Sequence, residues 1–333
     1  MRLLPRIAQT LTMAAILLVA NGCAQAVDTA DDRANLVMAP LDGQPWALVW
    51  NDEFVGEELD RTKWTPEQSC WGGGNDERQC YTDRPENIEV ADGLLLLKAR
   101  KERFTGPDRP PEIAQTPNPE VTQEYTSGKI RTKGLHSWKY GRFEVRAKVP
   151  AGQGMWPAVW MMPEAAEYGG WPLSGEIDIL EAVNIGAACD ECEGDVGENR
   201  HVSALHFGKL PPGNLYVDQK SALPDLSLPS DDFHVYAVEW GEGLIRFLVD
   251  DRVHLTVTRD QWSTASEKAA GNPNAPFDKP FYIMANLAVG GAWPERENEK
   301  GLDDGALPNQ FEIDWIRVYQ CSTDPEKGLA CMK

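Results

Sequence analysis

Short strand-like segments separated by turn residues are the strongest constraint on the fold. Residues 142–149 alternate strictly, with Phe143, Val145, Ala147 and Val149 on one face and charged side chains on the other, which is the period of a half-buried strand. Further strand candidates lie at 94–99, 233–240, 244–249, 281–288 and 311–319, and the sequence contains no convincing amphipathic helix. This pattern predicts an all-β sandwich of two antiparallel sheets.

Three carboxylates lie in a six-residue stretch whose other members are aliphatic: Glu176, Asp178 and Glu181. Because strand side chains alternate, Glu176 and Asp178 share one face. Strict alternation would place Leu180 on that face and Glu181 behind it, whereas a bulge of one residue would return Glu181 to the same face as the other acids. Adjacent acids repel one another, so packing alone gives no reason for the cluster.

Paired carboxylates on one face suit glycoside hydrolysis, in which one acts as nucleophile and the other first as acid and then as base. An intermediate Asp would help to separate the two pKa values. Clustered carboxylates also bind calcium, but calcium ligands usually come from loops, and this segment is strand-like. Catalysis is therefore the favoured interpretation.

Tryptophans surround the acidic segment. Trp156 and Trp160 lie shortly before it and are four residues apart, so they would share a face of a strand, and Trp171 precedes it immediately. Indole rings stack on sugars and also fill cores. Beside a carboxylate cluster, we favour sugar contact.

Length and charge limit the function classes. The 333 residues carry 42% hydrophobic residues and a formal charge of −20, enough for one large domain. The negative charge argues against nucleic acid or an anionic membrane as partner and favours a neutral substrate.

Two segments resemble insertions. Residues 106–120 contain five prolines and are expected to form an exposed loop. Residues 189–199 are expected to form a surface loop, which could also rim an active site.

The N-terminus resembles an export signal. Arg2 and Arg6 precede an apolar run over 7–20, which is too short for a confident membrane span. Ala24-Gln25-Ala26 predicts a signal peptide over 1–26, whereas residues 20–23 resemble a lipobox that would anchor the chain through Cys23. Either alternative predicts an extracellular location, or an outer-membrane-anchored or periplasmic one, with a linker over 27–44, a domain over 45–321 and a tail over 322–333.

Six further cysteines form three locally spaced pairs, at 70 and 80, 189 and 192, and 321 and 331. Such pairs are consistent with disulfides in an oxidising compartment, although six cysteines allow fifteen connectivities. A metal site at 189–192 is the alternative, but it lacks a second pair or nearby His ligands.

Several motifs, in one order over 46–320, resemble glycoside hydrolase family 16, retaining β-glycanases with a concanavalin A-like β-jelly-roll sandwich and a concave substrate cleft. They lie at 50–54, 81–87, 127–134, 140–144, 175–181, 281–287 and 314–319. The inserted Leu180 is typical of the laminarinase-like endo-β-1,3-glucanases and of the agarase and carrageenase branches. Segments 156–160 and 288–291 look most like the laminarinase group.

The resemblance implies Glu176 as nucleophile, Asp178 as its assistant and Glu181 as acid/base. It also implies a set of residues lining the sugar subsites: Trp156, Trp160, Asn87, Arg131 and His206. For His206, a satisfied core histidine is the alternative. A structural calcium would match Asp314 with backbone oxygens near Glu53 and Gly93.

The resemblance favours a β-1,3-glucan substrate such as laminarin, with no cofactor for catalysis and no protein partner, in a monomer. Mixed-linkage glucan, agarose and carrageenan remain alternative substrates, and a non-catalytic β-glucan-binding protein remains an alternative function. The charge of −20 makes sulfated substrates less attractive.

Overall fold

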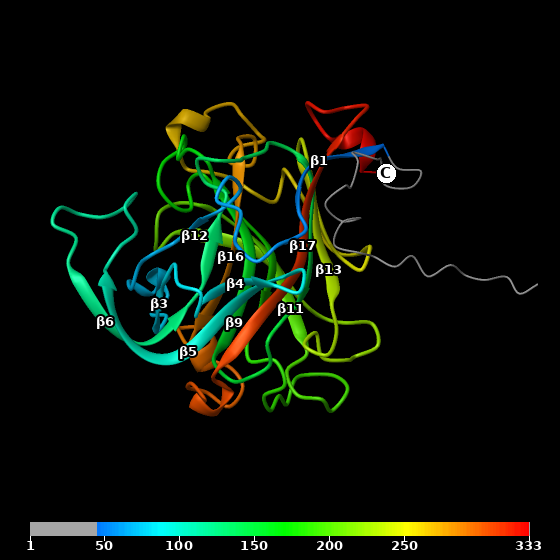
Figure 1. The fold of residues 1–333 in the computed structure, drawn as a ribbon. Coiled ribbons are helices and arrows are strands. Elements are labelled where there is room, and N and C mark those ends of the chain that lie inside the picture. Colours follow the sequence, from blue (N-terminus) through cyan, green and yellow to red (C-terminus); the bar gives the residue numbers. More distant parts are fainter. Residues whose placement is uncertain (1–44, 333) are drawn as a thin grey trace, which may run out of the picture.

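Two β-sheets enclose one large apolar core in the computed structural model, which describes residues 45–332 (Figure 1). The predicted signal peptide, Cys23 and the linker lie outside the described residues. Within 45–332 the structure contains strands and five short 3-10 helices but no α-helix. The expected all-β jelly-roll sandwich is confirmed.

The larger sheet has ten strands, in the order β15-β14-β13-β8-β17-β5-β6-β3, with β1 added on β17 and β4 on β5. Its strands are β1 (Trp46–Asp52), β3 (Gln79–Tyr81), β4 (Ile88–Ala91), β5 (Leu94–Pro107), β6 (Glu120–Ser127), β8 (Gly141–Lys148), β13 (His234–Gly241), β14 (Leu244–Val249), β15 (Arg252–Thr258) and β17 (Asn309–Cys321). The six strand candidates of the sequence correspond to β5, β8, β13, β14 and β17 and, in the smaller sheet, β16 (Phe281–Val289).

The smaller sheet has seven strands, in the order β12-β11-β10-β9-β16-β7-β2. Its strands are β2 (Thr65–Pro66), β7 (Lys129–Arg131), β9 (Met155–Pro163), β10 (Glu176–Ala182), β11 (Arg200–Gly208), β12 (Asn214–Ala222) and β16 (Phe281–Val289). The 3-10 helices are η1 (Gly72–Gly74), η2 (Glu267–Ala269), η3 (Pro294–Arg296), η4 (Asp304–Ala306) and η5 (Leu329–Cys331).

Alternation along the strands explains which side chains fill the core. On β8, Phe143, Val145 and Ala147 are fully buried, as the sequence predicts. From the smaller sheet, Leu205 and Ile283 meet them in the same core. The opposite face of the smaller sheet is therefore free to carry polar and aromatic side chains.

Strands β5 and β6 continue beyond the main body as a curved two-stranded arm, on the left of Figure 1. Residues 108–119 connect the two strands and are mostly exposed, which agrees with the expected proline-rich loop. The main chain of Cys70 bonds to Pro107 and Asp108 at the base of this connection. The arm is thus attached to the segment that carries the first disulfide.

The six described cysteines form the three local disulfides, Cys70–Cys80, Cys189–Cys192 and Cys321–Cys331. The Cys189–Cys192 bond excludes the alternative metal site at this pair. The third bond holds the residues after β17 against a small apolar cluster that includes Trp46, Tyr319 and Met332. Residues 329–332, at the end of the segment that the sequence predicts as a tail, therefore pack on the domain.

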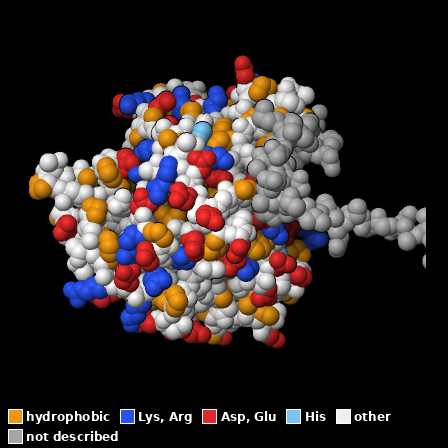
Figure 2. All heavy atoms as spheres, in the orientation of Figure 1, with side chains coloured by type: hydrophobic (Ala, Val, Ile, Leu, Met, Phe, Trp, Pro, Cys, Tyr) orange, Lys and Arg blue, Asp and Glu red, His pale blue; other side chains and the backbone are white. Residues whose placement is uncertain are grey.

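Acidic and basic side chains are interspersed on the face of the molecule in Figure 2, so the net negative charge is not gathered there into one patch. No helix among residues 45–332 has both the length and the apolar character needed to cross a membrane.

Candidate active site

The three acids lie on β10, and the strand bulges between the second and the third. In the pairing with β11, Asp178 lies opposite Ala204 and Glu181 opposite Val202. The chain thus advances three residues on β10 while it advances two on β11. Ile179 and Leu180, the two residues within the bulge, are both buried in the core. Glu181 therefore returns to the face of Glu176 and Asp178, and the predicted bulge is confirmed.

A row of paired residues crosses the smaller sheet at the level of Asp178. Asp178 is opposite Ala204 on β11 and Trp160 on β9, Trp160 is opposite Met284 on β16, and Met284 is opposite Arg131 on β7. Residues directly opposite in antiparallel strands share a face. Strand register thus places Trp160 and Arg131 on the acids' side of the sheet.

The environment of Glu181 raises its pKa to near neutral pH. Burial raises the pKa of Glu181 to about 7; the hydrogen bond from Trp156 lowers it, and the nearby charges of Glu176, Asp218 and Glu77 raise it. Trp156 Nε1 donates this bond to Glu181 Oε1 at 2.9 Å. A carboxyl group with such a pKa can act as a general acid at physiological pH.

Asp178 is the most deeply buried of the three acids, with 2% of its surface exposed. Burial raises its pKa well above the ordinary value, and the charges of Glu176 and Glu181 and a hydrogen bond with Glu176 act in the same direction. His206 Nε2 lies 3.4 Å from Asp178 Oδ2. The expected polar contact of His206 near the acids is therefore present.

Glu176 accepts a hydrogen bond from Trp171 Nε1. The Trp171 ring lies 6.1 Å from the ring of His206, and His206 lies 5.7 Å from the strongly exposed Tyr216. Aromatic side chains thus extend the site beyond the nucleophile position, across β10, β11 and β12.

Trp156 and Trp160 flank the acids on β9, with both rings partly exposed. Trp160 Nε1 donates to Asn286 Oδ1 at 2.7 Å, and Lys129 Nζ lies 5.0 Å from the centre of its ring. Trp293 packs edge-on against Trp156, with ring centroids 5.3 Å apart and planes at 89°.

Trp171 lies beside the acids, as its place in the sequence indicates, whereas Trp293 is a site residue that the sequence patterns above do not single out. A signal for both is present, because the chain contains three Trp-Pro dipeptides, at 156–157, 171–172 and 293–294. In the structure all three tryptophans gather around the acids. The recurring dipeptide therefore indicates which tryptophans belong to the site, although it does not predict where each one lies.

The expected sugar contact of Asn87 is wrong. Its side chain has no exposed surface, and both of its amide atoms form hydrogen bonds with other residues of the domain. Oδ1 accepts from Thr82 and Arg84, while Nδ2 donates to the carbonyl of Lys98 and to Thr126, both at 3.0 Å. Asn87 therefore links β5 and β6 to the preceding loop.

Arg131 lies on the acids' face of the sheet, but its guanidinium is largely covered. It lies 3.5 Å from Glu67 and 2.5 Å from Glu112, the latter from the proline-rich connection of the arm. Glu67, which has 3% exposed surface, also pairs with Lys129 at 3.2 Å. A sugar contact of Arg131 would require Glu112 to move, and it stays a prediction.

Arginine side chains engage two of the acidic residues near the predicted calcium site, and the calcium stays a prediction. Glu53 accepts two bonds of 2.8 Å from Arg317, and Asp314 accepts one of 2.5 Å from Arg146. Arg146 thus competes with a cation for the one carboxylate of the predicted site, that of Asp314, whereas Glu53 and Gly93 are expected to contribute backbone oxygens. Gly93 lies in the tight turn between β4 and β5.

One atom from each of Glu176, Asp178 and His206 lies within 4.8 Å of the others, which is close enough to hold a metal ion. Calcium and magnesium favour oxygen ligands alone, so an imidazole in the set does not suit them. The raised pKa of Glu181 suits proton transfer better.

Comparisons with known proteins agree with this geometry. The family profile described as "Beta-porphyranase A-D, GH16 domain" matches residues 46–321. The chain is 39% identical over 281 residues to glucan endo-1,3-beta-glucosidase A1 of Niallia circulans, covering 82% of this chain but only 38% of that longer relative. It is 38% identical over 279 residues to the beta-glucanase of Rhodothermus marinus, covering 83% and 85% of the two chains.

Among solved structures, the laminarinase from Rhodothermus marinus matches with a TM-score of 0.66 and 35% identity, over 82% of this chain and 97% of that one. Sequence and fold thus agree with these relatives over almost the whole described region. The chain belongs to glycoside hydrolase family 16.

Proposed function

We propose that this domain is a retaining endo-β-1,3-glucanase of the laminarinase type. The observation that carries the proposal is the pair Glu176 and Glu181 on one bulged strand, with the pKa of Glu181 raised to about 7. The names of similar proteins, a glucan endo-1,3-beta-glucosidase and a laminarinase, support the substrate.

In the first step, Glu181 donates its proton to the glycosidic oxygen while the Glu176 carboxylate attacks the anomeric carbon. The bond from that carbon to the leaving sugar breaks, and a covalent glycosyl–enzyme ester forms. Asp178, buried between the two, holds a hydrogen bond with Glu176 and fixes its orientation. Trp171 donates to the same carboxylate from the other side.

In the second step, Glu181, now ionised, removes a proton from a water molecule that attacks the anomeric carbon. The ester bond to Glu176 breaks, the sugar leaves with its original configuration, and Glu181 is protonated again. No step requires a metal or a cofactor. The aromatic rings of Trp156, Trp160 and Trp171 would hold the flanking sugars by stacking.

Azide can test the two roles separately. In Glu176→Ala, azide would replace the missing nucleophile and attack glucan directly, giving an α-glycosyl azide. In Glu181→Ala, assayed on an activated aryl glycoside, azide would attack the ester and give the β-glycosyl azide. Glu326→Ala, at an exposed site, is the control and should retain full activity.

Near-normal hydrolysis of laminarin by Glu176→Gln would refute the assignment of the nucleophile. An inverted configuration in the wild-type product would refute double displacement altogether.

A second candidate keeps the mechanism and changes the polysaccharide, because the matching family profile is described for beta-porphyranases. Release of reducing ends should be compared on laminarin, lichenan, agarose, carrageenan and porphyran. Highest kcat/KM on laminarin supports the main proposal, and highest kcat/KM on a galactan supports the second. Binding to glucan without release of reducing ends would indicate a non-catalytic binding protein.

We also propose that the chain is exported, either with cleavage before Val27 or with lipid attached at Cys23, and that it acts as a monomer. The basic and apolar N-terminal pattern supports export, and three disulfides are compatible with an oxidising compartment. Mass spectrometry of the mature N-terminus from a bacterial host would distinguish the two forms, and sedimentation would test the oligomeric state.

A further inference from the structure

The two tryptophans beside Glu181 form a corner. Trp156 donates to Glu181, and Trp293 meets Trp156 edge-on at 5.3 Å. Lys220 Nζ lies 5.9 Å from the centre of the Trp293 ring. The indole that bonds to the acid/base carboxylate is therefore braced by a second indole from a different part of the chain.

Trp293 lies in a segment with little regular structure. Residues 290–303 contain one short 3-10 helix, η3, and no strand. Such a segment must be held by contacts with its neighbours. Gln153 supplies one set, since its Nε2 donates to the carbonyls of Pro294 at 3.1 Å and Gly301 at 3.0 Å.

Asn184 supplies the other set and lies two residues after β10. Its side chain is completely buried. Oδ1 accepts from the Gly154 amide at 2.7 Å, immediately before β9, while Nδ2 donates to the Pro294 carbonyl and to Asn298 Oδ1, both at 2.9 Å. One side chain thus joins the acidic strand, the strand of Trp156 and the segment of Trp293.

The backbone at Asn184 is left-handed, with a φ of +58°. Asn tolerates this conformation better than most residues, and glycine adopts it freely. The position thus combines an unusual backbone with a side chain whose hydrogen-bonding atoms are all engaged.

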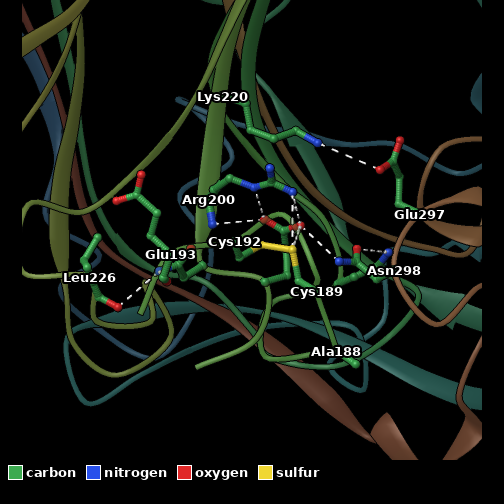
Figure 3. Close-up of a disulfide and its surroundings, with 12 residues drawn as sticks. Ala188, Cys189, Cys192, Glu193, Arg200, Lys220, Leu226, Glu297 and Asn298 are labelled. Carbon is green, nitrogen blue, oxygen red and sulfur yellow. Dashed lines mark hydrogen bonds and ion pairs between the residues drawn. A yellow bond between two sulfur atoms is a disulfide. The ribbon is translucent and has the colours of Figure 1, made fainter. Parts of the chain in front are cut away.

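A second group of contacts supports the outer end of this arrangement. Figure 3 shows Arg200 and Asn298 on either side of the Cys189–Cys192 disulfide, with Lys220 reaching toward Glu297. The buried Glu198 carboxylate joins the group, since it accepts from Arg200 at 2.7 Å and from Asn298 Nδ2 at 3.0 Å. Asn298 is therefore bonded on both sides, to Asn184 and to Glu198.

We infer that Asn184 is a positioning residue for the acid/base: it sets the Trp156–Trp293 corner, and through Trp156 the hydrogen bond to Glu181. The inference rests on the proposed function of Glu181 and adds to it a residue that touches neither substrate nor a catalytic carboxylate. Asn184 acts by fixing the relative position of three segments that carry the site.

Asn184→Gly tests the inference, because glycine accepts the left-handed backbone, removes all three side-chain bonds and adds no charge. We expect kcat/KM on laminarin to fall about tenfold, as for loss of one hydrogen bond to a catalytic group. Since the bond from Trp156 lowers the pKa of Glu181, the variant should also raise this pKa by up to about one unit.

The pKa of Glu181 is to be followed by ¹³C NMR of labelled Glu carboxyls, assigned with the spectrum of Glu181→Gln. This measurement needs no substrate, so it remains valid if laminarin is not hydrolysed. Failure of the proposed function and failure of the inference are thereby distinguished.

Asn298→Gly is a milder second variant, since Asn298 also has a positive φ and lies at the outer end of the group. It should shift the titration of Glu181 in the same direction by less. Asn199→Gly is the matched control, because Asn199 is equally buried but donates only to the carbonyls of Glu193 and Leu226.

The inference is refuted if folded Asn184→Gly and Asn298→Gly both keep the wild-type titration of Glu181, or if Asn199→Gly shifts it as much. Circular dichroism establishes folding, and if Asn184→Gly does not fold, the result for Asn298→Gly decides.

Discussion

Replacing the acid/base with its amide is expected to stabilise the fold at alkaline pH. Burial raises the pKa of Glu181 from 4.5 in the unfolded chain to about 7 in the fold. Above pH 7 the folded protein must therefore hold an ionised group in a site that disfavours the charge. Glu181→Gln keeps the shape and the acceptor for Trp156 but carries no charge.

The size and sign of the effect follow from the shift. Below pH 4.5 the carboxyl group is protonated in both states, so wild type and variant should have similar unfolding free energies. As pH rises toward 7, the unfolded state releases its proton first, and the wild type loses stability relative to the variant. A difference of about 2.5 between the two pKa values, at about 1.4 kcal/mol for each pH unit, gives up to about 3.5 kcal/mol above pH 7.

Urea unfolding at pH 4, 6 and 8 measures the difference, with ionic strength constant and the disulfides intact. Tryptophan fluorescence reports the transition, and slopes should match between proteins. Glu326→Gln, at an exposed position, removes a carboxylate outside the site and serves as the control. Its difference from wild type should change little with pH.

A difference between Glu181→Gln and wild type that does not grow from pH 4 to pH 8 would refute the reasoning. So would a wild type that is the more stable protein at pH 8. Either result would mean that Glu181 ionises in the fold without penalty, and its assignment as the acid would lose its physical basis.

Three further outcomes are expected. Because only protonated Glu181 can protonate the leaving oxygen, kcat/KM on laminarin should decline above about pH 7, and a profile flat to pH 9 would contradict this. Asn87→Ala should lower the unfolding free energy by about 2–4 kcal/mol without changing KM, since four buried bonds are lost; a raised KM at wild-type stability would restore the sugar contact. Removing the Cys70–Cys80 bond with a double Ser variant should cost about 2–3 kcal/mol in urea unfolding, and no loss would show that the arm does not depend on it.

The position of the acids could be predicted because it depends on local periodicity. Alternation with period two fixes which side chains share a face, and one extra residue changes the face in a way that can be counted. The same reasoning places Trp156 and Trp160 together, since they are four residues apart on β9.

The contacts that decide whether a polar residue is free for substrate are not local. Arg131 is engaged by Glu67 and Glu112, which folding brings to it from other segments. The same holds for Asn87, because the motif at 81–87 identifies the residue but does not predict its four hydrogen-bond partners. Sequence periodicity carries no information about such partners.

The bulge on β10 affects both the core and the direction of the Glu181 side chain. Without Leu180, simple alternation would already put Glu181 on the face of Asp178, so the insertion is not needed to gather the acids. What it adds is a fully buried leucine on the core side, beside Ile179. Burial of such a side chain contributes about 2 kcal/mol to the free energy of unfolding. It thereby offsets part of the stability that the raised carboxyl pKa values on the same strand remove at neutral pH. A bulge also increases local twist and re-aims the next side chain, so the insertion changes the direction of Glu181 relative to Glu176 while it strengthens the core beneath them.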